Sequence, residues 1–139
     1  MTKPVKDSFE NPVQNINIKD PFDDFYAPVY TTLISDQIKD RSLFEVNELI
    51  EKTDLKDYNK PQLLDIGCGG GDHLKLLSNK KIDNLHLTGI DKSNSMLKET
   101  KERLGKKHRN SVRLIKKNIN KNDLFGPSSF SHIVSYYFT

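Results

Sequence analysis

The fold is decided by the stretch Leu63-Leu64-Asp65-Ile66-Gly67-Cys68-Gly69-Gly70-Gly71, in which a short apolar run ends in an acid and then breaks into closely spaced glycines. A second apolar run, residues 87–90, ends in Asp91, about 20 residues after the last of these glycines. A parallel sheet that holds a nucleotide-like cofactor at its edge has this order of strand, glycine turn, helix, strand and acid. The glycines allow a sharp turn and a close approach of the ligand, because no Cβ blocks it. Asp91 is placed to accept hydrogen bonds from ribose hydroxyls.

The spacing of the glycines bears on the kind of cofactor. A dinucleotide fingerprint needs glycine at its first, third and sixth positions, and counting from Gly67 the sixth position is Asp72. The pattern present is instead Asp65-x-Gly67-x-Gly69-x-Gly71. With this pattern the chain resembles the class I S-adenosylmethionine-dependent methyltransferases, whose first motif is an acid followed by alternating glycines. S-adenosylmethionine has no pyrophosphate for a helix N-terminus to hold, and its ammonium group suits an acid near the loop.

The resemblance covers residues 61–139 and implies a role for each matching position. The glycines would wrap the methionine and ribose parts of the cofactor, Asp65 would orient the loop beside the amino group, and Asp91 would bind the ribose. Asn118 falls where the family has an acid that contacts adenine, and Tyr136 falls where the fourth strand's end nears the transferable methyl. Ser131 stands where that strand has an aspartate. The cofactor-binding residues expected from the resemblance are Asp65, Gly67, Cys68, Gly69, Gly71, Asp91, Lys92, Met96, Asn118, Ile119 and Tyr136.

The chain divides into a flexible polar arm at residues 1–24, N-terminal helices and a linker at 25–60, and an S-adenosylmethionine-binding domain at 61–139. A capping box, Ser42-x-x-Glu45, predicts the start of the second N-terminal helix. Beyond residue 61 the pattern predicts strands at 62–66, 85–90, 112–116 and 131–138, with helices at 72–78 and 93–104. Ser93 is expected to cap the second of these helices and Gly105 to end it, while Met96 packs on the sheet. Alternating strands and helices imply parallel strands with right-handed crossovers.

The predicted fold class is therefore α/β, a Rossmann-like, doubly wound parallel sheet of the class I methyltransferase type with an N-terminal helical extension. The family's sheet continues beyond its fourth strand, whereas this sequence stops at Thr139. We expect an incomplete sheet of about four strands, a fragment that is inactive alone. The last strand would have an exposed edge and self-associate through it, or a partner chain would complete the sheet.

Composition narrows the function classes. No apolar run has the length of a membrane span and the N-terminus has no secretory signal, so we expect a cytoplasmic protein. The net charge of +3 is too small to imply a nucleic-acid partner. A basic cluster at Arg103, Lys106, Lys107, Arg109 and Arg113 is better explained as a solvated helix end, which leaves RNA binding as a weaker alternative.

Two other residue types carry no clear chemistry. The four histidines show no metal-ligand spacing, so no metal site is expected. The single cysteine, Cys68, is interpreted as a small side chain between glycines, because no base is fixed beside it.

The expected reaction is transfer of a methyl group from a sulfonium to a nucleophilic oxygen, nitrogen or carbon of an acceptor that the sequence does not identify. Such a reaction depends mainly on proximity and orientation, so no catalytic base is assigned. Two alternatives stay open at this point, a nicotinamide-dependent oxidoreductase and a non-catalytic cofactor-binding module.

Overall fold

The structure is a computed structural model, and it describes residues 26–108, 111–119, 125–126 and 128–136. The polar arm expected at residues 1–24 lies outside the described residues, as do Arg109 of the basic cluster and the last two predicted residues of the fourth strand. The division of the chain into three parts stays a prediction.

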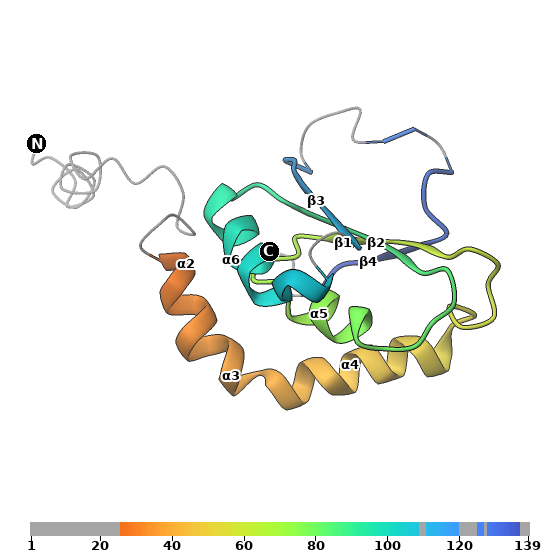
Figure 1. The fold of residues 1–139 in the computed structure, drawn as a ribbon, viewed down its shortest axis with the longest axis horizontal. Helices are drawn as coiled ribbons and strands as arrows, with labels where there is room; N and C mark the ends of the chain where they lie inside the picture. Colours follow the sequence, from red (N-terminus) through yellow and green to blue (C-terminus); the bar gives the residue numbers. More distant parts are fainter. Residues whose placement is uncertain (1–25, 109–110, 120–124, 127, 137–139) are drawn as a thin grey trace, which may run out of the picture.

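Four parallel strands form one sheet in the order β3-β2-β1-β4 (Figure 1). They are β1 (Gln62–Ile66), β2 (His86–Asp91), β3 (Val112–Lys116) and β4 (His132–Val134). The register places the β1 residue Asp65 beside Gly89 of β2 and Val134 of β4. Strand β1 is thus central, and the carboxyl ends of β1 and β2 lie side by side. The predicted parallel α/β sheet of four strands is confirmed.

Two helices connect these strands, α5 (Asp72–Ser78) between β1 and β2 and α6 (Asn94–His108) between β2 and β3. The Ser93 hydroxyl accepts the Met96 N–H at 3.3 Å, so the predicted cap of α6 is confirmed. The helix extends further than predicted, to His108, but its regular geometry is interrupted at Gly105, which has a φ of 70°. The predicted break at this glycine is therefore confirmed.

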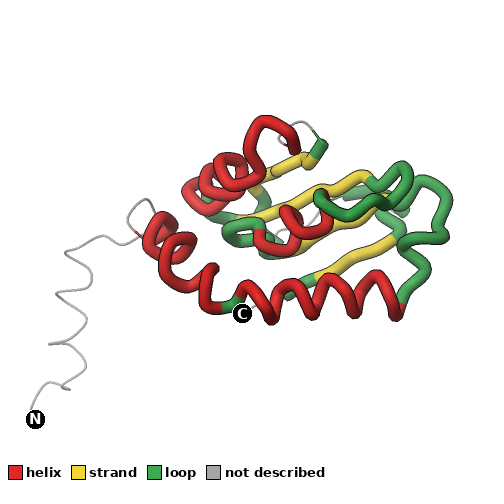
Figure 2. Tube along the Cα trace, turned by 60° about the horizontal axis from the view of Figure 1, so that its bottom comes forward, coloured by secondary structure: helices red, strands yellow, loops and turns green. Residues whose placement is uncertain are grey.

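The hydrophobic core lies between the sheet and these helices. Leu63 and Leu87 project from neighbouring strands onto Leu74 and Leu77 of α5, and all four are at most 4% exposed. A Cβ on Gly89 would lie only 2.5 Å from Leu74 Cδ1, so α5 packs directly on the β2 backbone. Figure 2 shows the strands side by side with the helices arranged along them.

The N-terminal extension consists of α2 (Tyr26–Val29), a π-helical turn η1 (Tyr30–Ile34), α3 (Ser35–Gln37) and α4 (Lys39–Lys52). In Figure 1 these elements form one curved segment, in which α4 packs on α5 and α2 approaches α6. The extension therefore lies over the helices that cover the sheet, with α5 between α4 and the strands.

The predicted capping box at Ser42 is wrong. Helix α4 begins at Lys39, and the Ser42 N–H donates to the Ile38 carbonyl at 2.9 Å as an ordinary member of the helix. Ser42 is 1% exposed and lies on the same side as buried Val46, so packing against the core places it inside the helix. Tertiary packing has overridden a local capping signal here.

The fourth strand is shorter than predicted, because β4 ends at Val134. Its only neighbour among the described strands is β1, and their pairing ends at Asp65 and Val134. The next residue, Ser135, donates its hydroxyl to the Ile66 carbonyl at 3.2 Å, so a side chain replaces the backbone ladder at that point. The chain then leaves the sheet, and Tyr136 lies beyond the strand rather than in it.

Candidate functional site

The loop of residues 67–71 joins β1 to α5 at the carboxyl edge of the sheet, and we call it the glycine loop. Gly67, Gly69 and Gly71 have φ values of 68°, 55° and 79°, a left-handed conformation that side chains rarely adopt. A Cβ on Gly71 would also lie 2.4 Å from the Thr100 Cγ2 atom of α6. The alternating glycines are therefore required by the local backbone, and by a close approach at the last of them.

Asp91 ends β2 next to this loop and is bound to it. Its Oδ2 atom accepts the Gly69 N–H at 3.0 Å, and its Oδ1 atom accepts the Ser93 N–H at 2.9 Å. The sequence predicts this acid as a ribose ligand, and no sequence pattern indicates that it also anchors the loop. Each carboxylate oxygen has two lone pairs, so the same group retains acceptor capacity for hydroxyls.

Asp65 ends the central strand beneath the loop and is 2% exposed. Burial, followed by the negative charges of Asp91 and Asp72, raises the pKa of its carboxyl from 3.8 to about 8. Three acids therefore gather at this edge, and the most buried of them holds its proton near neutral pH. A positive group placed here would favour ionisation of Asp65.

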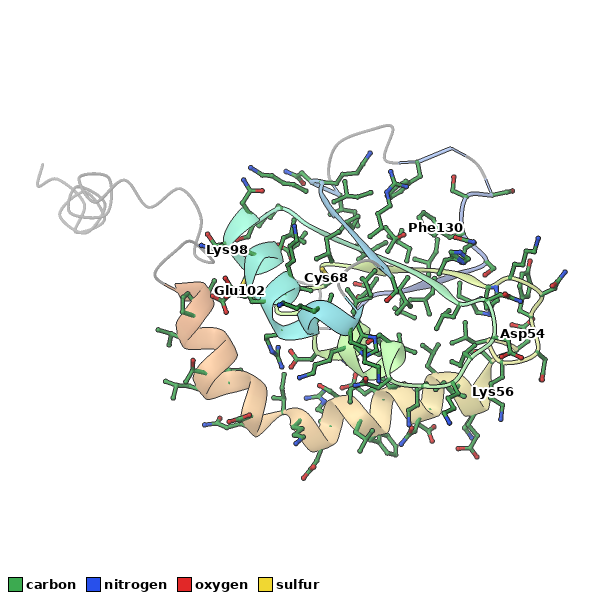
Figure 3. All side chains as sticks on the ribbon, in the orientation of Figure 1. Asp54, Lys56, Cys68, Lys98, Glu102 and Phe130 are labelled. Atoms are coloured by element: carbon green, nitrogen blue, oxygen red, sulfur yellow. The ribbon has the colours of Figure 1, made fainter. Side chains whose placement is uncertain are left out.

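Cys68 faces the interior. It is 7% exposed, and a Cβ on Gly89 would lie 2.9 Å from its Sγ atom. Burial and then the charge of Asp65 raise the pKa of the thiol well above its ordinary value, which suppresses a thiolate nucleophile. Figure 3 labels Cys68, whose buried side chain offers little surface to a ligand.

The remaining predicted positions surround the same edge. Met96 is 2% exposed on α6, and its Cε atom would lie 3.6 Å from a Cβ on Gly69. Lys92 is exposed directly after Asp91. The Lys117 N–H donates to the Asp91 carbonyl at 3.0 Å, which brings exposed Asn118 and half-buried Ile119 to the end of β2.

Comparison with protein-family models shows to which family the chain belongs. The family model described as "Methyltransferase domain" matches residues 63–139, which includes the glycine loop, Asp91 and the four strands apart from Gln62. The chain belongs to this methyltransferase domain family. A comparison with curated proteins gives no match.

Several solved structures share the fold of this methyltransferase domain. CalS10, an amino pentose methyltransferase from Micromonospora echinaspora bound to S-adenosylmethionine, has a TM-score of 0.54 and 23% identity over 69% of this chain and 36% of its own. DesVI from Streptomyces venezuelae has a TM-score of 0.59 and 24% identity over 81% of this chain and 43% of its own. An S-adenosylmethionine-dependent methyltransferase from Aquifex aeolicus has a TM-score of 0.55 and 24% identity, with coverage of 68% and 48%. The present chain thus spans less than half the length of each.

The methyltransferase domain contains a second cluster near the loop that sequence reasoning missed. The ring of Tyr136 stacks on that of His73, with centroids 3.8 Å apart and planes 4° from parallel. The His73 Nε2 atom lies 3.8 Å from Glu45 Oε1 of the N-terminal extension. Burial, then the charges of Asp65 and Glu45, raise the pKa of Tyr136 to about 12. Tyr136, which the sequence predicts at the end of the fourth strand, therefore lies against the first turn of α5.

The electrostatics of His73 complete this cluster. Burial lowers the pKa of its imidazole, and the nearby charges of Glu45 and Asp72 oppose this effect. The stacked ring is therefore kept mainly neutral near pH 7. No local sequence pattern predicts this cluster, because its three residues come from α4, α5 and the segment after β4.

A third polar cluster lies at the opposite, amino edge of the sheet. His132 Nε2 lies 2.7 Å from Asp54 Oδ1, and His132 Nδ1 lies 2.9 Å from Ser131 Oγ. The Ser131 oxygen accepts the Gln62 N–H at 2.8 Å, so it joins β4 to β1 instead of being available for chemistry. Figure 3 shows Asp54 far from Cys68. Ser131 thus has a structural role at the position where the family has an aspartate.

Other site types find no support in the described part of the chain. No group of three histidine, cysteine, aspartate or glutamate residues in it is arranged to hold a metal ion. Arg103 of the basic cluster is directed inward, with its guanidinium 2.9 Å from the Asp72 carboxylate. Among the described helices, none combines the length and apolar character that a membrane span requires.

Proposed function

We propose that this chain binds S-adenosylmethionine at the carboxyl edge of β1 and β2 and supplies the cofactor half of a methyltransferase. The observation that carries the proposal is the glycine loop, tied to Asp91 and lying above buried Asp65. Family membership supports it. The S-adenosylmethionine bound to CalS10 and the sinefungin bound to the glycopeptide N-methyltransferase MtfA, which has a TM-score of 0.54 and 15% identity, are consistent with it.

The charges at this edge favour a cationic ligand over a dinucleotide. S-adenosylmethionine carries a sulfonium and an ammonium, whereas a nicotinamide cofactor would place two phosphates near the start of α5. That helix begins with Asp72, and Asp91 lies on the other side of the loop. Asp72 replaces the third glycine of the dinucleotide fingerprint, and its carboxylate, which Arg103 compensates only in part, argues against a pyrophosphate at this point and so against the nicotinamide alternative.

The residues of this chain would act by binding and orientation. The bound sulfonium makes its methyl group electrophilic, and transfer needs an acceptor oxygen, nitrogen or carbon in line with it. The glycine loop would hold the methionine part, Asp91 the ribose and Asn118 the adenine, while Tyr136 would border the acceptor side. We assign the rate enhancement to proximity and orientation, and we assign no residue as a catalytic base.

Isothermal titration tests the cofactor proposal directly. Residues 1–139 should release or absorb heat with S-adenosylhomocysteine in a saturable way and give no saturable heat with NAD. The same titration with a Gly69→Val variant, which has a branched side chain in the loop, should give no binding. Saturable binding of NAD with none of S-adenosylhomocysteine would overturn the proposal.

The acceptor, the partners and the compartment belong to the proposal as well. The acceptor class is left open, and a nucleic-acid partner is disfavoured because Arg103 is held within the fold. We propose a cytoplasmic location, supported by a sequence whose single cysteine is buried and is unsuited to disulfide formation. We also propose that the free edge of β4 pairs with a further strand, supported by Ile133, which is 61% exposed.

A further inference from the structure

Two side chains of α6, Thr100 and Arg103, reach across to the backbone of the glycine loop. They lie three positions apart, so they share one face of the helix. We call this pair the α6 clamp. Neither belongs to the glycine motif or to the predicted set of cofactor-binding residues.

Thr100 supports the loop from below in two ways. Its hydroxyl lies 2.6 Å from the Gly69 carbonyl and 3.0 Å from the Met96 carbonyl. Because the hydroxyl has one proton to donate, the shorter distance favours a hydrogen bond to Gly69 in the loop. Its methyl group fills the space that a Cβ on Gly71 would need, at a distance of 2.4 Å. The side chain is fully buried, which makes the hydroxyl contact stronger than an exposed one would be.

Arg103 holds the next part of the loop. Its Nη1 atom donates to the Gly70 carbonyl at 2.9 Å, and its Nη2 atom donates to Asp72 Oδ1 at the same distance. The side chains of Arg103 and Asp72 are 25% and 10% exposed, so solvent screens the pair only in part. A planar guanidinium that makes two bonds fixes the direction of both acceptors.

The clamp and Asp91 together bond both backbone groups of Gly69. The Gly69 carbonyl points to Thr100, while the Gly69 N–H points to Asp91. The Gly70 carbonyl points to Arg103. A loop of glycines is otherwise the most flexible kind of backbone, and ordering it on binding would reduce affinity.

We propose that Thr100 and Arg103 are positioning residues that hold the glycine loop in its ligand-binding conformation before the cofactor arrives. The inference deepens the proposed function and rests on it for the identity of the ligand. It assigns the affinity of the site partly to contacts that α6 makes with the Gly69 and Gly70 carbonyls of the loop. Pre-organisation of this kind removes an ordering cost from binding.

The first test uses the ligand-free protein. The Gly69 and Gly71 amides donate to Asp91 Oδ2 and to the Cys68 carbonyl, so their hydrogen exchange reports opening of the loop. Arg103→Met should speed exchange at these amides by about tenfold or more, while the amides of β1 and β2 keep their rates. Arg113→Met, which removes an exposed guanidinium from β3, is the matched control and should change nothing in the loop.

The second test compares two substitutions at Thr100. Thr100→Val keeps the shape and removes the hydroxyl, whereas Thr100→Ser keeps the hydroxyl and removes the methyl. The affinity for S-adenosylhomocysteine should fall about tenfold in Thr100→Val and change less than about threefold in Thr100→Ser. A merely structural role would lower the melting temperature in both variants without this split in affinity.

The outcomes separate the clamp from the cofactor proposal. A wild-type chain that binds no S-adenosylhomocysteine contradicts the cofactor proposal, and hydrogen exchange then decides the clamp alone. Unchanged loop exchange in Arg103→Met and in Thr100→Val, with intact folds by circular dichroism, overturns the clamp.

Discussion

At the scale of single residues, Asp65 links stability to pH. Its pKa is about 8 in the folded chain, compared with the ordinary value of 3.8. At pH values between 3.8 and about 8 the folded state keeps a proton on Asp65 that the unfolded state releases. The contribution of the protonated carboxyl to the free energy of unfolding is therefore present in full below pH 3.8 and is lost as pH rises through about 8. The loss has a slope of at most about 1.4 kcal/mol per pH unit.

Asp65→Asn should therefore raise the free energy of unfolding at pH 8 and have less effect at pH 5, because the amide resembles the protonated acid and does not ionise. Urea denaturation at the two pH values measures the difference. Asp83→Asn, at an exposed turn, is the control and should show no such dependence. Equal effects of Asp65→Asn at both pH values would mean that the acid is ionised in the fold throughout.

Asp91 offers a second prediction at this scale, since it is both the loop anchor and the expected ribose ligand. A ribose hydroxyl bound to a carboxylate contributes roughly 1.5–3 kcal/mol, so Asp91→Ala should weaken binding of S-adenosylhomocysteine by at least about tenfold. An analogue that lacks both ribose hydroxyls separates the two roles. If Asp91 binds the ribose, the wild type prefers the natural ligand and Asp91→Ala binds both ligands with similar affinity. A preference that survives in Asp91→Ala would leave Asp91 with the anchoring role alone.

At the scale of elements, the loop between β1 and α5 depends on close packing against α6. Gly69 and Gly71 both have left-handed backbones, but only at Gly71 would a Cβ meet an atom at 2.4 Å. At Gly69 the nearest atom, Met96 Cε, would be 3.6 Å away. Gly69→Ala should therefore destabilise by about 1–2 kcal/mol from backbone strain, and Gly71→Ala by a further ~1–3 kcal/mol from overlap.

Thermal unfolding of the two variants measures this contrast. Adding Thr100→Ser to Gly71→Ala removes the overlapping Cγ2 atom and should recover part of the lost stability. Equal melting temperatures for Gly69→Ala and Gly71→Ala would show that α6 yields to the added methyl group.

The bounds of the helices and strands show which parts of the fold can be predicted from the sequence alone. Strands β1 and β3 and helix α5 have the predicted bounds, because apolar runs with sharp polar or glycine boundaries define them. Strand β2 is shifted by one residue, to His86–Asp91. The prediction for β4 was too long because its aromatic residues have strand propensity, while the structure ends the strand where its pairing with β1 ends.

Contacts between distant segments account for the rest of the site. The sequence predicts the glycines, Asp65 and Asp91 as a group, since one motif contains them. It does not predict that Arg103 holds Gly70, or that Tyr136 stacks on His73, because these pairs come from different elements. Such contacts depend on how helices pack on the sheet, which local periodicity does not specify.

At the scale of the whole molecule, the two edges of the sheet differ. Strand β3 is one edge and β4 is the other, and β4 has only three residues. Ile133 of β4 is 61% exposed although it lies in register with Leu64 of β1, which is 3% exposed. Apolar side chains of parallel strands are normally buried on both faces, so the exposure of Ile133 shows apolar surface at this edge that the described residues leave uncovered.

The final prediction follows from that edge. Residues 1–139 in isolation should self-associate in proportion to concentration, because an unpaired strand with an apolar side chain recruits other strands. Ile133→Lys places a charge at the exposed position and should shift the population toward the monomer, since edge charges oppose strand pairing. Lys98→Glu, which changes an exposed charge on α6, the helix that leads to the opposite edge strand β3, serves as the control. Light scattering after size exclusion gives the mass of each variant.

A methyl-transfer assay with labelled cofactor and a broad acceptor panel should show turnover near zero for the isolated chain. A wild-type monomer at all concentrations, with steady turnover, would show that β4 needs no further strand and that residues 1–139 contain a sufficient acceptor site.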